Sequence, residues 1–405
     1  MPRYIICEAC FVYEKHRLKL WKDTPMPSLL PHIDPDGLLE YSVVFTDRSL
    51  NSMSVSFQTV MTDISALLKD AYKAAAVAVI PGGGTFGMES IARQFANDQH
   101  VMIIRNGWFS YRWSEILEKG KIASSTTVMV ARREDTGGSN QMAPFAPEPV
   151  DEVVATIRDE KPAVVFAPHV ETSAGMILPD DYIRAVSDAV HEVGGIFVLD
   201  CVASGALWVD MSALGVDVLL SAPQKGWSAS PCAGLVMLSE RGRAAVAATE
   251  SSSYVCDVKK WLAIVETYEN GGHAYHATMP TDALKLFRDT LIETKNYGFE
   301  AVRQEQIQLG ASIRALLEER GFASVAADGF KAASVVVSYT DDEALKNGSK
   351  FAAAGLQIAA GVPLQCGEGP DYKSFRIGLF GLDKLHNIPR SVENFATALD
   401  RVVAS

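Results

Sequence analysis

The sequence predicts an α/β protein with a large domain, built on a mostly parallel sheet covered by helices, and a smaller C-terminal α+β domain. The first observation is the alternation of short apolar runs, loops and amphipathic segments from about residue 74 to 225, a pattern typical of helix-covered parallel sheets. The second is that the apolar runs 196–199 and 216–220 each stop on polar residues, as buried strands do. The third is a new set of helices and strands after about residue 300.

Each element follows from the local pattern. Helical spacing of apolar residues predicts a helix over 54–73. Short apolar runs predict strands over residues 74–80, 101–104, 125–132, 163–166, 196–199, 216–220 and 233–238. Amphipathic segments predict further helices over 150–159 and 180–193, whereas 133–149 and 251–280 are expected to be irregular. Beyond them we expect a long, mostly helical segment over 281–318. From about residue 300 we expect a helix over 300–320, strands over 333–339 and 375–379, and helices over 341–354 and 390–403.

The chain of 405 residues has room for two domains and an extension. We expect an N-terminal arm over residues 1–44, a large domain over 45–290 and a small domain over 291–405. The formal net charge of −12 argues against a protein that binds nucleic acid or an anionic membrane. No apolar run approaches the roughly 20 residues of a membrane span. The N-terminus lacks the apolar core of a signal peptide, so we expect a cytoplasmic protein.

Two ionisable residues follow strands of the predicted sheet. Asp200 ends the run 196–199, and Lys225 comes shortly after the run 216–220. Open α/β sheets bind ligands at the carboxyl ends of their strands, so we expect these two side chains to meet there. Pyridoxal phosphate (PLP) needs a lysine for its Schiff base and an acid beside its pyridine nitrogen. Each residue alone would be unremarkable, but the pair predicts a PLP site.

A glycine-rich loop at 81–87 precedes a predicted helix. Glycines let the backbone approach an anion, and the helix N-terminus offers free N–H groups. The glycines at 82, 84 and 87 also fit the G-x-G-x-x-G pattern of dinucleotide-binding proteins, which expects an acidic residue about 20 positions further on. The next strand ends instead in Arg105, which would suit the 2′-phosphate of NADP. An NADP-dependent enzyme therefore stays open as an alternative.

The segments DCVAS at 200–204 and SAPQK at 221–225 resemble the class V aminotransferases of PLP fold type I, most of all their alanine–glyoxylate and serine–glyoxylate group. The resemblance implies that Lys225 forms the Schiff base with PLP, that Asp200 pairs with the pyridine nitrogen, and that Val202 packs on the ring. It implies further cofactor contacts from Gly83, Gly84, Thr85, Phe109, Thr172 and Gln224. Phe109 is the residue implied to stack on the ring, with Trp108 as the neighbouring alternative.

Two further segments extend the resemblance. Tyr275 and Thr278 match residues that reach the PLP phosphate of a partner subunit, which implies a homodimer with active sites at the interface. Arg376, within Phe-Arg-Ile-Gly, matches the arginine that binds the substrate carboxylate. This role suits an arginine, because its guanidinium can give a carboxylate two parallel hydrogen bonds.

The resemblance implies an aminotransferase that moves an amino group from a small amino acid, such as alanine or serine, to a 2-keto acid such as glyoxylate or pyruvate. A 2-aminoethylphosphonate–pyruvate aminotransferase shares these motifs and is an alternative. A PLP lyase or cysteine desulfurase of the same fold is another, with Cys366 as the candidate loop cysteine, although Gln224 rather than a histidine precedes Lys225. We expect no metal site, because Cys7 and Cys10 have no second pair at zinc-binding spacing.

Overall fold

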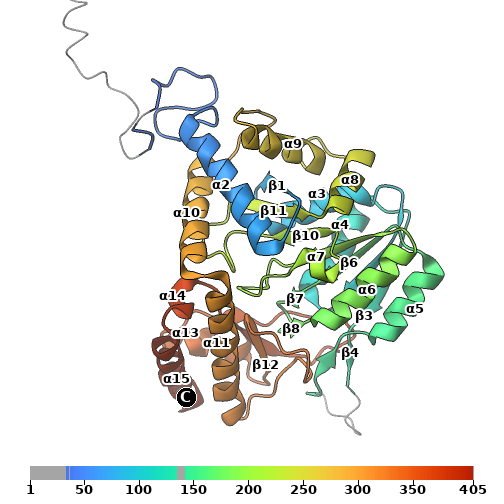
Figure 1. The fold of residues 1–405 in the computed structure, drawn as a ribbon. Coiled ribbons are helices and arrows are strands. Elements are labelled where there is room, and N and C mark those ends of the chain that lie inside the picture. The colour runs from blue at the N-terminus through green and yellow to red at the C-terminus, as the bar shows by residue number, and fades with distance from the viewer. Residues whose placement is uncertain (1–32, 36, 135–141, 405) are drawn as a thin grey trace, which may run out of the picture.

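The computed structural model describes residues 33–35, 37–134 and 142–404 (Figure 1). Its centre is a seven-stranded sheet in the order β1-β11-β10-β9-β6-β2-β3. The strands are β1 (Ala76–Pro81), β2 (His100–Arg105), β3 (Ser125–Val130), β6 (Val164–Pro168), β9 (Ile196–Asp200), β10 (Val218–Ser221) and β11 (Ala233–Leu238). Only β11 runs antiparallel to its neighbours, β1 and β10. The prediction of a mostly parallel sheet is confirmed.

Helices cover this sheet, as the predicted alternation requires (Figure 1). They are α2 (Val55–Tyr72), α3 (Gly84–Phe95), α4 (Trp108–Gly120), α5 (Val150–Glu160), α6 (Asp180–Glu192), α7 (Met211–Leu214), α8 (Glu240–Ala248) and α9 (Val258–Glu269). Helix α3 packs on β11, α4 on β2, α6 on β9 and α9 on β1. Apart from the edge strand β3, the strands of this sheet are almost wholly buried, which explains why they appear in the sequence as apolar runs.

The C-terminal part has its own sheet and core. Strands β12 (Val335–Tyr339), β14 (Ser374–Gly378) and β13 (Ala359–Ala360) pair antiparallel in that order. The helices of this part are α11 (Phe299–Glu319), α12 (Glu343–Lys346), α13 (Ser349–Ala353), α14 (Leu382–Leu385) and α15 (Ile388–Ala404). Leu309, Phe351 and Phe375 are buried in its hydrophobic cluster. The predicted α+β character is confirmed, whereas the boundary at 290/291 falls inside α10 (Thr281–Tyr297) and stays a prediction.

The expected helical segment over 281–318 is confirmed, and it is divided into α10 and α11 at Gly298, which has φ of +109°. Three local predictions were wrong. The segment 251–280 contains helix α9, whose N-terminus is capped by Asp257. The helix expected over 341–354 is divided into α12 and α13. Residues 132–133 and 145–146 pair as the short strands β4 (Arg132–Arg133) and β5 (Phe145–Ala146) across the expected loop.

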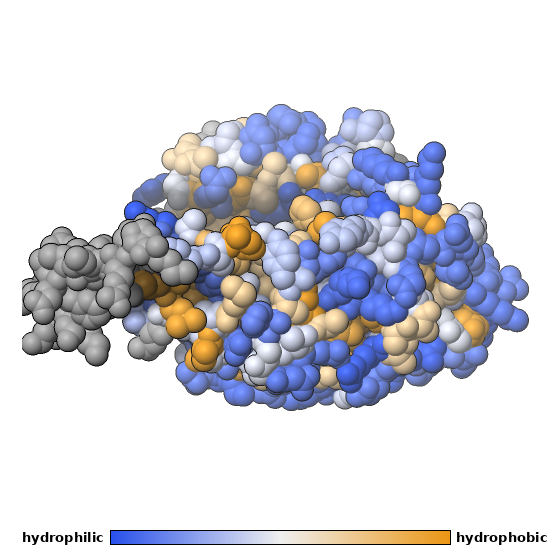
Figure 2. All heavy atoms as spheres, turned by 90° about the horizontal axis from the view of Figure 1, so that it is seen from above, coloured by the Kyte–Doolittle hydropathy of each residue, from blue (hydrophilic) through white to orange (hydrophobic). Residues whose placement is uncertain are grey.

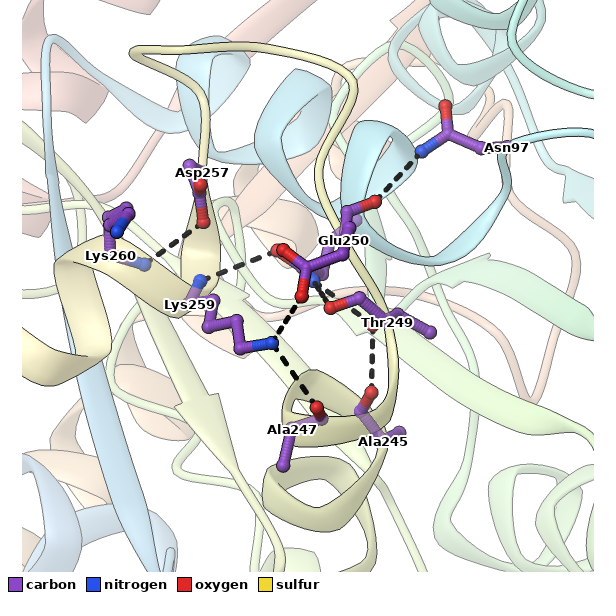
Figure 3. Close-up of polar contacts among 9 residues, drawn as sticks. Asn97, Ala245, Ala247, Thr249, Glu250, Asp257, Lys259 and Lys260 are labelled. Carbon is purple, nitrogen blue, oxygen red and sulfur yellow. Dashed lines mark hydrogen bonds and ion pairs between the residues drawn. The ribbon is translucent and has the colours of Figure 1, made fainter.

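The connection between α8 and α9 is fixed by polar contacts around Glu250 (Figure 3). The Nζ atom of Lys259 lies 2.5 Å from the Glu250 carboxylate, and Asn97 donates to the Glu250 carbonyl at 3.2 Å. The same connection carries Tyr254, whose ring centroid lies 4.5 Å from that of His276. These contacts hold the segment around residue 275 against the large domain.

The described surface is mostly hydrophilic on one face of the molecule. Figure 2 shows hydrophilic side chains over most of the face seen from above, with hydrophobic ones interspersed in small groups. Within the described parts of the chain, no helix is long and apolar enough to cross a lipid bilayer. The first 32 residues, which include Cys7, Cys10 and most of the predicted arm, lie outside the described residues.

Candidate active site

A cavity of about 270 Å³ lies at the carboxyl ends of the parallel strands. Open α/β sheets bind ligands at the carboxyl ends of their strands, so a ligand site was predicted at this edge. Eight of the residues singled out in the sequence line the cavity together: Gly84, Thr85, Phe109, Thr172, Asp200, Val202, Gln224 and Lys225. Gly83 precedes Gly84 as the N-cap of α3. Segments that are far apart in the sequence therefore meet in one place.

Asp200 and Lys225 are the ionisable pair of this cavity. Asp200 is the last residue of β9, and its Oδ1 accepts a hydrogen bond from the Val202 amide at 2.9 Å. Burial raises the pKa of Asp200 to about 6. Burial, together with the nearby charge of Arg376, lowers the pKa of the Lys225 amine. A lysine with a lowered pKa is more often uncharged, which makes its amine a better nucleophile and base.

The N-terminus of α3 forms another wall. Its N-cap is Gly83, which offers no side-chain cap, and its first turn contains no acidic residue. The first N–H groups of the helix are therefore free to bind an anion. A Cβ atom on Gly84 would lie 2.9 Å from Cγ2 of Val202, so a larger residue would fill the space next to this helix end.

The buried Glu171 holds the aromatic wall of the cavity in place. Its carboxylate accepts hydrogen bonds from the backbone N–H groups of Phe109 at 3.1 Å and Ser110 at 2.9 Å, at the start of α4. It also accepts from the Ser173 hydroxyl at 2.7 Å. Phe109 lines the cavity, whereas Trp108 packs on Tyr111 with 5.7 Å between ring centroids. The geometry thus favours Phe109 over Trp108 as the aromatic residue of the site.

Two arginines stand over the Phe109 ring. Arg376, on β14, has its Cζ 5.4 Å from the ring centroid, and its Nε donates to the carbonyl of Ala360 at 2.8 Å. Arg112, on α4, has its Cζ 4.6 Å from the same centroid and lines the cavity. Arg112 was not predicted from the sequence. Its spacing of three residues from Phe109, which places both on one face of a helix, was the available signal.

Other predicted residues lie outside this cavity. Tyr275 and Thr278 are exposed, with their hydroxyl oxygens 3.2 Å apart. Arg105 donates to the Ser114 hydroxyl at 2.8 Å and to the Gln365 carbonyl at 3.3 Å. Because Arg105 is engaged there, the NADP alternative loses the residue on which it depended.

The residues of the cavity fit PLP. The Gln224 Oε1 atom is buried without a hydrogen-bond partner, which marks a place for a donor from a ligand. The buried carboxylate of Asp200 suits a protonated ring nitrogen, and the free N–H groups of α3 suit a phosphate. Val202 and Phe109 offer apolar surfaces for a flat ring. Fold and site together define a PLP-dependent enzyme of fold type I.

Comparison with known proteins identifies the family. Residues 42–362 match the family model for aminotransferase class-V, and the chain belongs to that family. The 2-aminoethylphosphonate–pyruvate transaminase of Burkholderia thailandensis is 28% identical over 92% of this chain and 98% of that protein. Alanine–glyoxylate aminotransferase 1 of Saccharomyces cerevisiae is 27% identical over 60% of this chain and 62% of that protein.

Solved structures share the fold. The alanine–glyoxylate aminotransferase of a Nostoc species superimposes with a TM-score of 0.71 at 21% identity, covering 86% of this chain and 87% of that chain. An aspartate aminotransferase of Thermus thermophilus gives a TM-score of 0.67 at 23% identity, covering 86% and 90%. The protein is an aminotransferase, and its cofactor is PLP.

Proposed function

We propose that the enzyme transfers an amino group from a small amino acid, such as alanine or serine, to a 2-keto acid such as glyoxylate or pyruvate. The observation that carries the proposal is the convergence of Asp200, Lys225 and the free N-terminus of α3 on one cavity, with Arg376 beside it. Asp200 and Lys225 would take part in the chemistry, the helix end would bind the cofactor phosphate, and Arg376 would bind the substrate carboxylate.

Bound PLP supplies an electron sink that stabilises negative charge on the substrate Cα atom. Lys225 would attach the cofactor and, as a free amine, would move a proton at the substrate Cα. Its lowered pKa suits it for this work near neutral pH. Asp200 keeps the ring nitrogen protonated. Gly83, Gly84 and Thr85 hold the phosphate, and Phe109, Thr172, Val202 and Gln224 contact the ring or its substituents.

Arg376 is suited to bind a substrate carboxylate. Its Nε is fixed by the Ala360 carbonyl, which leaves the two terminal nitrogens of the guanidinium for a second partner. Among the described residues, no carboxylate forms an ion pair with Arg376. An incoming amino or keto acid would supply this carboxylate and be oriented by it.

Tyr275 and Thr278 are proposed to complete the site of a second subunit in a homodimer. The support is their exposure outside the cavity of their own chain and their mutual contact at 3.2 Å. Sedimentation of the PLP-loaded protein tests this assignment. A stable monomer with bound cofactor would contradict it.

A second candidate donor is 2-aminoethylphosphonate, which is favoured by the relative that aligns over 98% of its length. The cysteine desulfurase alternative is weakened by Cys366. Its Sγ lies 3.7 Å from the Arg105 carbonyl oxygen, and burial raises its pKa well above the ordinary range. A desulfurase needs a thiolate, which this environment disfavours.

The experiment is a donor panel. The PLP-loaded protein is incubated with glyoxylate or pyruvate and with alanine, serine, aspartate or 2-aminoethylphosphonate, and the amino acid products are quantified by mass spectrometry. We expect one of the small amino acids to form glycine from glyoxylate or alanine from pyruvate. Turnover with 2-aminoethylphosphonate alone would select the second candidate. Cysteine with a thiol reductant is tested in parallel, and release of sulfide from it without amino transfer in any incubation would contradict both candidates.

A further inference from the structure

Arg112 lies next to the N-terminus of α3, and neither the motifs nor the relatives' names assign it a role. The Nη1 atom of Arg112 donates to the Thr85 hydroxyl at 3.3 Å, and Thr85 is the second residue of α3. We propose that Arg112 binds the phosphate group of PLP and supplies its fixed counter-charge. This inference rests on the proposed placement of the phosphate at Gly83, Gly84 and Thr85.

Two independent features converge on this position. The helix end offers unpaired N–H groups and the positive end of its dipole, with no side-chain cap or first-turn acid to satisfy them. The guanidinium of Arg112 approaches the same turn from another helix, α4. A phosphate dianion placed there would accept hydrogen bonds from both, and such charge-assisted bonds are among the strongest in proteins.

The other cations of the site are committed elsewhere. Lys225 attaches the cofactor at the other end of the molecule, because the aldehyde and the phosphate are different groups of PLP. Arg376 belongs to β14, does not line the cavity itself, and is assigned to the substrate carboxylate in the proposed function. Within the described residues, Arg112 forms no ion pair with a carboxylate. Of the cations that line the cavity, Arg112 is therefore the one left for the phosphate.

The position of Arg112 is set before a ligand arrives. Its Cζ lies 4.6 Å from the centroid of the Phe109 ring, a distance suited to a cation–π contact. Phe109 is held in turn by the hydrogen bond from its N–H to the buried Glu171. Arg112 thus loses little freedom when it binds, and a planar guanidinium fits a phosphate better than a lysine would.

The test uses the full-length protein with Arg112→Met, and Arg376→Met as the matched control over the same ring. PLP and pyridoxal, which lacks the phosphate, are each titrated and followed by absorbance. We expect the ratio of PLP affinity to pyridoxal affinity to fall about ten- to a hundredfold in Arg112→Met, as loss of a charge-assisted hydrogen bond to the phosphate implies. Both arginines also act on the Lys225 amine through their charge. That effect should change the affinities for PLP and pyridoxal equally, so Arg376→Met should leave their ratio unchanged.

A second readout follows the phosphate itself by ³¹P NMR of the loaded proteins. A neighbouring cation favours the dianion, so the wild-type signal should stay constant through about pH 6, where a free phosphate monoester titrates. In Arg112→Met the signal should move with pH. Unchanged PLP affinity, or an equal loss for PLP and pyridoxal, would overturn the inference about Arg112. A wild-type protein that binds no PLP would overturn the cofactor site itself.

Discussion

Replacing Asp200 by asparagine should stabilise the cofactor-free protein, although it removes a residue that the enzyme needs. Burial raises the pKa of the Asp200 carboxyl from an ordinary 3.8 to about 6. At about 1.36 kcal/mol per pH unit, the charged carboxylate costs the folded protein ~3 kcal/mol above pH 7. Asparagine is uncharged and can still accept the hydrogen bond from the Val202 amide.

The sign follows from proton binding. Between pH 3.8 and about 6 the folded protein holds a proton on Asp200 that the unfolded chain has released. The contribution of this group to stability therefore falls as the pH rises through that window. The gain from Asp200→Asn should grow from about 1 kcal/mol at pH 4.5 to ~3 kcal/mol at pH 7.5. With PLP bound the sign should reverse, because the ring nitrogen loses its acidic partner.

Urea unfolding of wild-type and variant protein at the two pH values measures this difference. Asp217→Asn is a suitable control, because this aspartate is also buried but its carboxylate has several hydrogen-bond partners. Its Oδ2 accepts from the Phe197 amide at 2.9 Å and lies 3.0 Å from His191 Nε2. Asparagine would put an NH₂ donor in place of one accepting oxygen and remove the ion pair with Arg241, which should destabilise the protein by ~1–3 kcal/mol. The reasoning would be refuted if Asp200→Asn were no more stable than the wild type at pH 7.5. It would also be refuted if the gain in free energy of unfolding were the same at both pH values.

Three further variants test the surroundings of the site. Gly107→Ala should lower the free energy of unfolding by ~1–3 kcal/mol, because the new Cβ would lie 2.1 Å from the Ser173 hydroxyl; an unchanged urea midpoint would contradict this. Glu171→Gln should cost ~1–3 kcal/mol, since an amide NH₂ would face donors that now bond to a carboxylate; thermal unfolding measures it, and a rise in Tm would be the contrary result. Cys366→Ala should leave amino transfer unchanged in the donor assay, because the partly buried thiol is not among the residues that line the cavity; loss of turnover would contradict this.

Much of the site was predictable because it depends on strand ends. Asp200 ends β9 and Lys225 follows the neighbouring parallel strand β10, so both lie at the carboxyl edge of the sheet, where ligands bind. The run of glycines at the start of α3 could be recognised in the sequence, and in the structure Gly84 lies against Val202. The strand ends alone predicted where in the fold the site lies. The family resemblance then predicted the chemical role of each residue.

The rest depends on contacts that no local pattern encodes. Glu171 bonds to Phe109 from a segment 62 residues away, and this pairing exists only once the strands have assembled. Arg112 was overlooked because an arginine on an amphipathic helix usually points into solvent. Its contact with Thr85 depends on how α4 packs in the folded protein. Helix α9 was missed because the glycines at 271 and 272 and the polar residues at 249–257 mask its short apolar face.

The most direct test of the central claim is chemical trapping. The purified protein is loaded with PLP, reduced with borohydride, digested and mapped by mass spectrometry. If Lys225 carries the cofactor, the pyridoxyl group is found on the peptide that contains Lys225, and prior addition of an amino donor that is turned over prevents its attachment. A pyridoxyl group on another lysine, or none at all in a protein saturated with PLP, would contradict the account.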